Sequence, residues 1–300
     1  MNKKTLMIVL IFSTVLLISL MGFIPVESSS EEGKTWMDNV DDACLITSLS
    51  IPGTHDSGAT HSIFDVAGKC QDTNITEQLN FGVRFLDIRL KLIEDELVIV
   101  HSFVDQKLTF EKVLMTITKY IKENPSEFLI VSIKEDDNAL KPLSTFNEAV
   151  LKAINGYNDI IVNDNNLPNT VGEARGKIYL LSRFESTVGI PAYHGWKDST
   201  SFNLDSIYIQ DNYCIDDIEE KICDIKDAIS YCNNNDGELV INFTSCYLDN
   251  AFPPSYAASA AKRINPWFLD YVDDFEGKLG IVVMDFMSIE LAESIYRRNY

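Results

Sequence analysis

Two histidines and one arginine have the side chains that acid-base attack on a phosphate ester requires. His55 and His101 are two of only four histidines in the chain, and Arg89 lies between them in the sequence. One histidine can act as a general base and the other as a general acid. An arginine between them can bind a phosphate through two hydrogen bonds and stabilise the charge that develops on it. This set favours in-line attack on a phosphodiester.

Carboxylates accompany these three residues. Asp56 directly follows His55, and Asp285 ends the last apolar segment of the chain. We expect Asp285 to orient one histidine and to stabilise its charged form. Asp87 is two residues before Arg89, so a strand would present both on one face. The chain has no Gly-x-Ser-x-Gly motif and no cysteine beside these residues in the sequence, so a covalent acyl-enzyme is not favoured.

Other polar residues also follow apolar, strand-like segments: Lys134, Arg183, Asp211 and Tyr213. Any one of them, taken alone, is more simply explained as a surface or turn residue. Together with the histidines, they predict one shared site at the carboxyl ends of the strands.

Alternating strands and helices predict a single α/β domain over residues 29–300. The predicted strands are Leu45–Ile51, Val83–Leu92, Leu97–His101, Phe128–Lys134, Lys177–Arg183, Ser206–Gln210, Glu238–Thr244 and Leu279–Asp285. The predicted helices are Thr109–Asn124, Ser144–Asn155, Ile215–Cys232 and Ser255–Asn265, the last one ending before Pro266. The number of strands fits an irregular TIM-type (β/α) barrel. An open doubly wound sheet is the alternative, but no glycine-rich phosphate loop follows the first strand.

Residues 1–28 have the pattern of an export signal, with Lys3 and Lys4 before an apolar run and small residues near Ser28. We expect cleavage and secretion; retention as an N-terminal anchor is the alternative. Six cysteines in an exported chain predict disulfides, with Cys44–Cys70 as the preferred pair. A net charge of −20 argues against binding of nucleic acid.

The residues around these positions resemble phosphatidylinositol-specific phospholipase C of the bacterial type. The resemblance rests on Ser50-Ile-Pro-Gly-Thr-His-Asp-Ser57, on Phe81-Gly-Val-Arg-Phe-Leu-Asp-Ile-Arg89 and on Val100-His101, and it continues through most of the chain to Val282-Val-Met-Asp285. It implies a barrel enzyme that cleaves phosphatidylinositol to diacylglycerol and inositol 1,2-cyclic phosphate. It also implies release of glycosylphosphatidylinositol anchors, because these share the head group.

The resemblance also implies roles for single residues. His55, supported by Asp285, would be the general base for the inositol 2-hydroxyl, and His101, helped by Asp56, would be the general acid. Arg89, held by Asp87, would bind the phosphate. The residues that would hold the inositol ring are Lys134, Arg183, Asp211 and Tyr213.

A positive side chain at position 89 stands where calcium-dependent relatives bind their ion, so we expect neither a metal nor another cofactor. Asp211 beside the ring would favour unphosphorylated phosphatidylinositol. We expect a monomer that contacts the membrane transiently through apolar groups, with Phe64, Trp196 and Phe252 as candidates. The alternatives are a glycerophosphodiester phosphodiesterase, which would need a metal-binding acidic pair near Arg89, and a non-catalytic lipid- or glycan-binding barrel.

Overall fold

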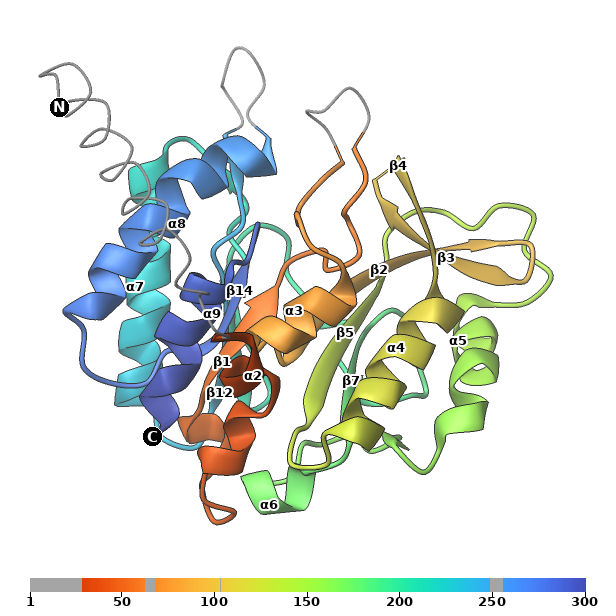
Figure 1. The fold of residues 1–300 in the computed structure, drawn as a ribbon. Helices are drawn as coiled ribbons and strands as arrows, with labels where there is room; N and C mark the ends of the chain where they lie inside the picture. The colour runs from red at the N-terminus through yellow and green to blue at the C-terminus, as the bar shows by residue number, and fades with distance from the viewer. Residues whose placement is uncertain (1–28, 63–67, 103, 249–255) are drawn as a thin grey trace, which may run out of the picture.

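A curled β-sheet with helices on its outer side forms the centre of the molecule (Figure 1). The computed structural model describes residues 29–62, 68–102, 104–248 and 256–300. The parallel strands follow the spatial order β7-β5-β2-β1-β14-β12-β10. Their bounds are Ser50–Thr54 (β1), Phe85–Ile93 (β2), Leu129–Glu135 (β5), Ile178–Arg183 (β7), Ile207–Gln210 (β10), Leu239–Phe243 (β12) and Gly280–Met284 (β14). The predicted irregular barrel is confirmed.

The parallel strands are buried on both faces, which explains their almost continuous apolar sequences. All five residues of β12 and all five of β14 are buried, and so are all six of β7. Strands of this kind are typical of parallel sheets whose outer face is covered by helices and whose inner face packs on itself. The barrel has one gap, because no ladder within the described ranges joins β7 to β10.

Shorter strands extend this sheet. β3 and β4 pair antiparallel next to β2, β9 pairs antiparallel with β10, and β6 and β8 each pair with β7. A separate two-stranded sheet joins β11 to β13. The bounds are Glu96–His101 (β3), Val104–Thr109 (β4), Ile161–Val162 (β6), Ile190–Pro191 (β8), Ser201–Leu204 (β9), Cys214–Ile215 (β11) and Tyr247–Leu248 (β13).

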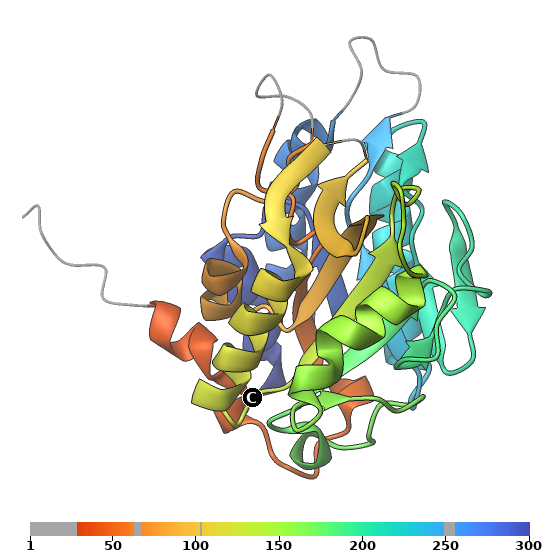
Figure 2. The ribbon, with the colours of Figure 1, turned by 90° about the vertical axis from the view of Figure 1, so that its right-hand side faces the viewer.

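Helices α7, α8 and α9 cover one flank of the sheet and α3, α4 and α5 the other; Figure 2 shows α4 in yellow and α5 in green. Their bounds are Ile75–Phe81 (α3), Phe110–Glu123 (α4), Phe146–Ile154 (α5), Ile218–Asn234 (α7), Ala257–Asp273 (α8) and Ile289–Tyr296 (α9). Shorter helices are Ser29–Lys34 (α2), Val171–Ala174 (α6), Trp36–Asn39 (η1), Ile46–Ser48 (η2), Asn155–Tyr157 (η3) and Arg297–Asn299 (η4). Side chains cap several of the longer helices; Thr109 and Thr145, for example, accept backbone N–H groups of α4 and α5.

Two predicted boundaries are wrong. The first strand begins at Ser50, because Ile46–Ser48 forms a 3-10 turn instead of the first part of Leu45–Ile51. The helix predicted to end before Pro266 continues to Asp273. Proline removes one hydrogen bond inside a helix, but Phe268 and Val272 beyond it are buried in the core, and this packing keeps the helix going.

The predicted Cys44–Cys70 disulfide is also wrong. All six cysteines lie in the described ranges and none is bonded to another. The Cys44 carbonyl accepts the amide of Val171, at the start of α6 near the amino ends of the strands, whereas the Cys70 carbonyl accepts the amide of Phe286 just beyond β14. The two cysteines therefore lie at opposite ends of the barrel, too far apart to bond.

Some expectations fall outside the described residues. The export segment, 1–28, and the candidate membrane contacts Phe64 and Phe252 belong to this group. None of the described helices combines the length and the apolar character that a bilayer crossing requires.

A buried ion pair closes the barrel at the amino ends of its strands. Arg84, fully buried, donates from Nε to Glu127 at 2.7 Å, and its Nη2 lies 2.6 Å from the same carboxylate. Its other N–H groups donate to backbone carbonyls, among them those of Leu79 and Gly33. Because every partner is satisfied, the pair links α2, α3 and β2 without leaving a charge uncompensated.

We expect Glu127→Gln to lower the free energy of unfolding by about 3–5 kcal/mol, because it leaves the guanidinium of Arg84 buried without its counter-charge. Urea denaturation measures the loss. Glu123→Gln is the control, since Glu123 pairs with Lys119 on an exposed helix face and should cost less than about 1 kcal/mol. Equal losses in the two variants would contradict the proposed importance of the buried pair.

Candidate active site

The register of β1 with β14 brings His55 and Asp285 together. Thr54 lies opposite Met284 in this parallel ladder, and the amide of His55 continues it by donating to the Met284 carbonyl at 2.9 Å. His55 and Asp285 are the next residues of the two strands, so their side chains meet just beyond the sheet. Two segments 230 residues apart thus form one hydrogen-bonded pair.

Three cations lie side by side at the same end of the barrel. Arg89 of β2 is opposite Lys134 of β5, and Lys134 is opposite Arg183 of β7. Neighbouring positive charges repel each other, so this row needs carboxylates between its members. Asp87, Asp136 and Asp211 provide them: Asp87 and Asp136 each lie within 4 Å of two of the cations, and Asp211 of Arg183.

His101 reaches this site from a hairpin. β3 runs antiparallel to β2, with Leu90 opposite Ile99, and this register carries His101 back to the level of Asp87 and Arg89. The expectation that every site residue ends a parallel barrel strand is therefore wrong for His101. The nine residues of β2 make it long enough for the returning strand to end beside the site.

His55 lies between a donor and an acceptor. Its Nδ1 is 2.7 Å from Asp285 Oδ1, and its Nε2 is 2.7 Å from Arg89 Nη2. Because arginine can only donate, Nε2 is the acceptor and Nδ1 carries the proton that Asp285 accepts. Burial lowers the pKa of His55 and Arg89 lowers it further, but Asp285 and Asp87 outweigh both, and the pKa lies above its ordinary value. The ring is oriented as a general base would need to be.

Arg89 is surrounded by carboxylates. Its Nε donates to Asp87 Oδ2 at 3.1 Å, and Asp56 and Asp136 lie at 3.8 and 3.7 Å. Asp87 is fully buried behind the guanidinium, and although burial alone would raise its pKa, Arg89 and Arg183 hold that pKa below the ordinary range. Asp87 does not line the cavity, and its carboxylate lies against both Arg89 and Arg183; a substrate-binding role for it stays a prediction.

Asp56 and His101 form a second histidine–carboxylate pair. His101 Nε2 is 3.8 Å from Asp56 Oδ2, and both Asp56 oxygens and His101 Nδ1 are buried without a hydrogen-bond partner. Burial raises the pKa of Asp56 to about 7, while burial, His55 and Arg89 lower the pKa of His101 to about 4. Between about pH 4 and pH 7 the pair therefore holds one proton, which rests on the carboxyl.

Asp56 also has a strained backbone. Its φ is 42°, in the left-handed region, and its amide donates to Asp87 Oδ2 at 3.2 Å. Aspartate tolerates this conformation better than most residues, and strain of this kind gathers at functional sites. The turn aims His55 and Asp56 in different directions from consecutive positions.

The far wall of the site contains Arg183 and Asp211. Arg183 Nη2 lies 3.5 Å from Asp211 Oδ2, and its guanidinium stacks on the Trp196 ring at 3.7 Å. Trp196 donates its indole N–H to Asp211 at 2.9 Å and packs against the core. Trp196 is partly buried, so its predicted membrane contact stays a prediction. Tyr213 donates to Asp198 at 2.5 Å.

These groups surround a cavity of about 610 Å³. Of the residues predicted from the sequence, it is lined by His55, Arg89, His101, Lys134, Arg183, Asp211, Tyr213 and Asp285. Nine further lining residues were not predicted from the sequence, among them Asp136, Cys70 and Tyr247. Asp136 follows Lys134-Glu135 in a run of charges that looks like an ordinary surface turn, so only its ion pairs with Arg89 and Lys134 distinguish it. The Tyr247 ring lies 5.9 Å from that of Tyr213.

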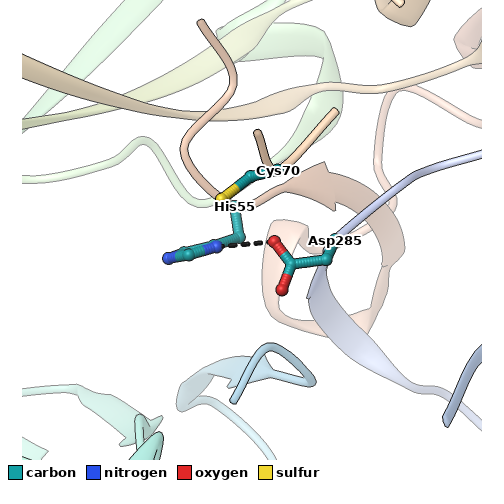
Figure 3. A group of neighbouring side chains, drawn as sticks. All are labelled: His55, Cys70 and Asp285. Carbon is teal, nitrogen blue, oxygen red and sulfur yellow. Dashed lines mark hydrogen bonds and ion pairs between the residues drawn. The ribbon is translucent and has the colours of Figure 1, made fainter. Parts of the chain in front are cut away.

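Cys70, which lies 15 residues after His55 in the sequence, is close to it in the fold. It is fully buried, lines the cavity and lies beside His55 and Asp285 (Figure 3). Burial, and then the charges of Asp285 and Asp56, raise the pKa of its thiol well above the ordinary value. Cys70 is therefore a neutral thiol at the edge of a charged site, and a nucleophilic role is not favoured.

Comparisons with known proteins agree with this geometry. The family model described as phosphatidylinositol-specific phospholipase C, X domain, matches residues 49–183, a segment that contains both histidines and all three cations. A 1-phosphatidylinositol phosphodiesterase of Listeria monocytogenes is 28% identical over 277 residues, which cover 89% of this chain and 85% of the relative. One of Staphylococcus aureus is 28% identical over 263 residues, or 80% and 83% of the two chains.

Solved structures show the same similarity. The phosphatidylinositol-specific phospholipase C of Listeria monocytogenes has a TM-score of 0.76 and 25% identity, with 89% of this chain and 99% of that chain covered. A double mutant of the Staphylococcus aureus enzyme has a TM-score of 0.78 and 25% identity over 89% and 98% of the two chains. In sequence and in fold, this chain is similar to bacterial phosphatidylinositol-specific phospholipase C, and residues 49–183 match the X domain of that family.

Proposed function

We propose that this chain is a phosphatidylinositol diacylglycerol-lyase that forms inositol 1,2-cyclic phosphate without a metal ion. The observation that carries the proposal is His55, held between Asp285 and Arg89 at 2.7 Å each, with His101 in the same cavity and Asp56 buried behind it. The relatives named 1-phosphatidylinositol phosphodiesterase support the substrate. Glycosylphosphatidylinositol anchors carry the same head group and are a further substrate under this proposal.

His55 takes the proton of the inositol 2-hydroxyl in the first step. Asp285 fixes the Nδ1–H tautomer and stabilises the imidazolium that forms, so it acts as a positioning residue. Arg89 Nη2 covers Nε2 in the free protein and moves to the phosphate when the substrate enters, which exposes the lone pair of His55 to the hydroxyl. Since nucleophile and phosphorus belong to one molecule, attack gains the advantage of an intramolecular reaction.

The Asp56–His101 pair supplies the proton for the departing diacylglycerol oxygen. Because its pKa is about 4, the His101 ring by itself would carry almost no second proton at neutral pH. The buried carboxyl of Asp56 retains one up to about pH 7 and passes it to the ring as negative charge builds up on the leaving oxygen. The proton held by Asp56 therefore allows His101 to act as a general acid despite its lowered pKa.

Arg89 performs the electrostatic work that calcium would do elsewhere. Its guanidinium lies within 4 Å of three carboxylates, a position that would otherwise suit a cation, and it would repel any ion bound there. When Arg89 binds the phosphate it stabilises the pentacoordinate transition state directly. This arrangement disfavours a glycerophosphodiester phosphodiesterase that needs a metal near the same residue.

Lys134, Arg183, Asp211 and Tyr213 bind the inositol ring. Lys134 and Arg183 donate to ring hydroxyls, Asp211 accepts from one, and Tyr213 covers a ring face. Asp136 and Asp211 would repel additional phosphates on the ring, so unphosphorylated phosphatidylinositol is preferred. The protein works outside the cell, exported through residues 1–28, as a monomer that meets membranes transiently.

Phosphorus NMR of phosphatidylinositol vesicles treated with the protein in excess EDTA tests the reaction class. The expected product is a cyclic phosphodiester, since the ring hydroxyl is the nucleophile. Complete loss of cleavage in EDTA would contradict metal independence, and a phosphomonoester as the first product would contradict the intramolecular attack.

We expect His55→Ala and His101→Ala each to lower kcat/KM by about 10²–10⁴, because each removes one proton-transfer group. Initial rates on the same vesicles measure the loss. His194→Ala is the matched control, since His194 is exposed and lies outside the cavity. A His101 variant with normal turnover would remove that residue from the mechanism.

Asp56→Asn should separate activity from stability. The native carboxyl binds its proton up to about pH 7 and the unfolded one only to about 3.8, so native stability falls as pH rises between these values. The amide removes this cost. We therefore expect the variant to be more stable than the wild type by up to roughly 4 kcal/mol at pH 8 and to match it near pH 4.

The same variant should lose its proton reservoir. We expect kcat/KM at pH 7 to fall by about 10²–10³, and the alkaline limb of the pH profile to move to lower pH, because His101 alone has a pKa near 4. Urea denaturation and pH–rate profiles provide the two measurements. An unshifted alkaline limb would show that Asp56 has only a structural role.

A further inference from the structure

Cys70 holds a thiol at a fixed position beside both histidine–aspartate pairs. Its backbone is pinned on two sides, since its amide donates to the Ala59 carbonyl at 2.8 Å and its carbonyl accepts the Phe286 amide at 2.7 Å. These bonds join the loop that carries Cys70 to the turn after β1 and to the turn after β14. Because neighbouring segments fix it, the sulfur is preorganised relative to His55 and Asp285.

Ligand atoms of two three-residue groups converge on this sulfur. One ligand atom each of His55, Cys70 and Asp285 lie within 4.8 Å of one another, and the same holds for Asp56, Cys70 and His101. Figure 3 draws the first of these two groups. Both Asp56 oxygens and His101 Nδ1 are buried without a partner. The thiol is therefore the shared member of two sets that each offer one sulfur, one nitrogen and one carboxylate oxygen.

The donor atoms select the class of metal. Thiolate, imidazole and carboxylate together are typical ligands of Zn²⁺, whereas Mg²⁺ and Ca²⁺ prefer oxygen alone. The set with His55 and Asp285 suits a cation better, because Arg89 contacts Nε2, the ring nitrogen turned away from Asp285. In the other set Arg89 Nε lies 3.8 Å from Asp56 Oδ2, so a positive charge already faces that carboxylate. Open cavity beside the three residues leaves room for a water as fourth ligand.

We propose that Cys70, His55 and Asp285 form an inhibitory Zn²⁺ site within the catalytic cavity. The ion binds the Cys70 sulfur, whose proton leaves to solvent, and it replaces the proton between His55 Nδ1 and Asp285. That ring proton moves to Nε2, and Arg89 turns away from this nitrogen because it can only donate. One proton is released in total. With Nε2 protonated, His55 has no lone pair for the inositol hydroxyl, and the reaction stops. The inhibition rests on the proposed lyase activity; the binding of the metal does not.

Cd²⁺ and Zn²⁺ test the binding directly. Cd²⁺ added to the whole protein should produce a thiolate-to-metal charge-transfer absorbance that Zn²⁺ abolishes by competition. Cys70→Ser and Cys70→Ala should lose this signal and weaken zinc binding by at least about 100-fold. Cys246→Ser is the matched control, because Cys246 is also buried and also lines the cavity, and it should keep the signal. A signal that persists in both Cys70 variants would overturn the site.

Histidine nitrogen NMR of the wild type provides a measurement that needs no variant. Zinc should change the His55 tautomer from Nδ1–H to Nε2–H, and His194 should be unchanged. If saturating zinc leaves the His55 resonances where they were, the proposal is wrong, even if the Cys70 variants do not fold.

Cleavage of phosphatidylinositol vesicles in zinc buffers completes the test. Zinc should inhibit the wild type and Cys246→Ser, while the Cys70 variants keep their activity in EDTA and need at least about 100-fold more zinc for the same inhibition. Absence of turnover in EDTA together with a normal charge-transfer signal would contradict the proposed function and leave the metal site standing. Equal zinc sensitivity of all variants would overturn the inhibitory site alone.

Discussion

The side-by-side alignment of Arg89, Lys134 and Arg183 on three adjacent strands is the constraint on which the rest of the site depends. The parallel register leaves no freedom to separate them, and three positive charges at strand spacing repel each other. The carboxylates of Asp87, Asp136 and Asp211 lie within 4 Å of these cations and offset the repulsion, and Asp87 is fully buried. The row can then face a cavity and still be stable, because each cation already has a partner before any substrate arrives.

This compensation decides where the protons lie. Asp87 accepts hydrogen bonds and ion pairs from Arg89 and Arg183, and its pKa falls. Asp56 has no hydrogen-bond donor to either oxygen, so burial dominates and its pKa rises to about 7. Two aspartates joined through a single backbone hydrogen bond thus have opposite protonation near neutral pH. The difference leaves Asp87 as a charged partner of Arg89 and Asp56 as a carboxyl that can keep its proton.

The sequence carried enough information to predict the barrel and eight of the seventeen residues that line its cavity, because those features follow from local patterns. Continuous apolar segments gave the strands, and a charged residue after each gave its end. Asp136 and Cys70 could not be found this way. Asp136 lies in a run of charges typical of a surface turn, and Cys70 lies in an irregular loop whose position depends on backbone bonds to Ala59 and Phe286. Pro266 led to a helix prediction that was too short, because tertiary packing maintains the helix beyond a residue at which local rules would end it.

The barrel is held together differently at its two ends. At the amino ends of the strands Arg84 and Glu127 form a fully buried ion pair, and Arg84 also donates to backbone carbonyls. Neither residue lines the catalytic cavity. At the carboxyl ends β7 and β10 share no ladder within the described ranges, and Arg183, Trp196 and Asp211 bridge them through side chains. Two of these three bridging residues also line the cavity. Under the proposed function, Arg183 and Asp211 would have to give up some of their contacts with each other to bind an inositol ring. The contacts that join β7 to β10 would therefore compete with the contacts to the ring.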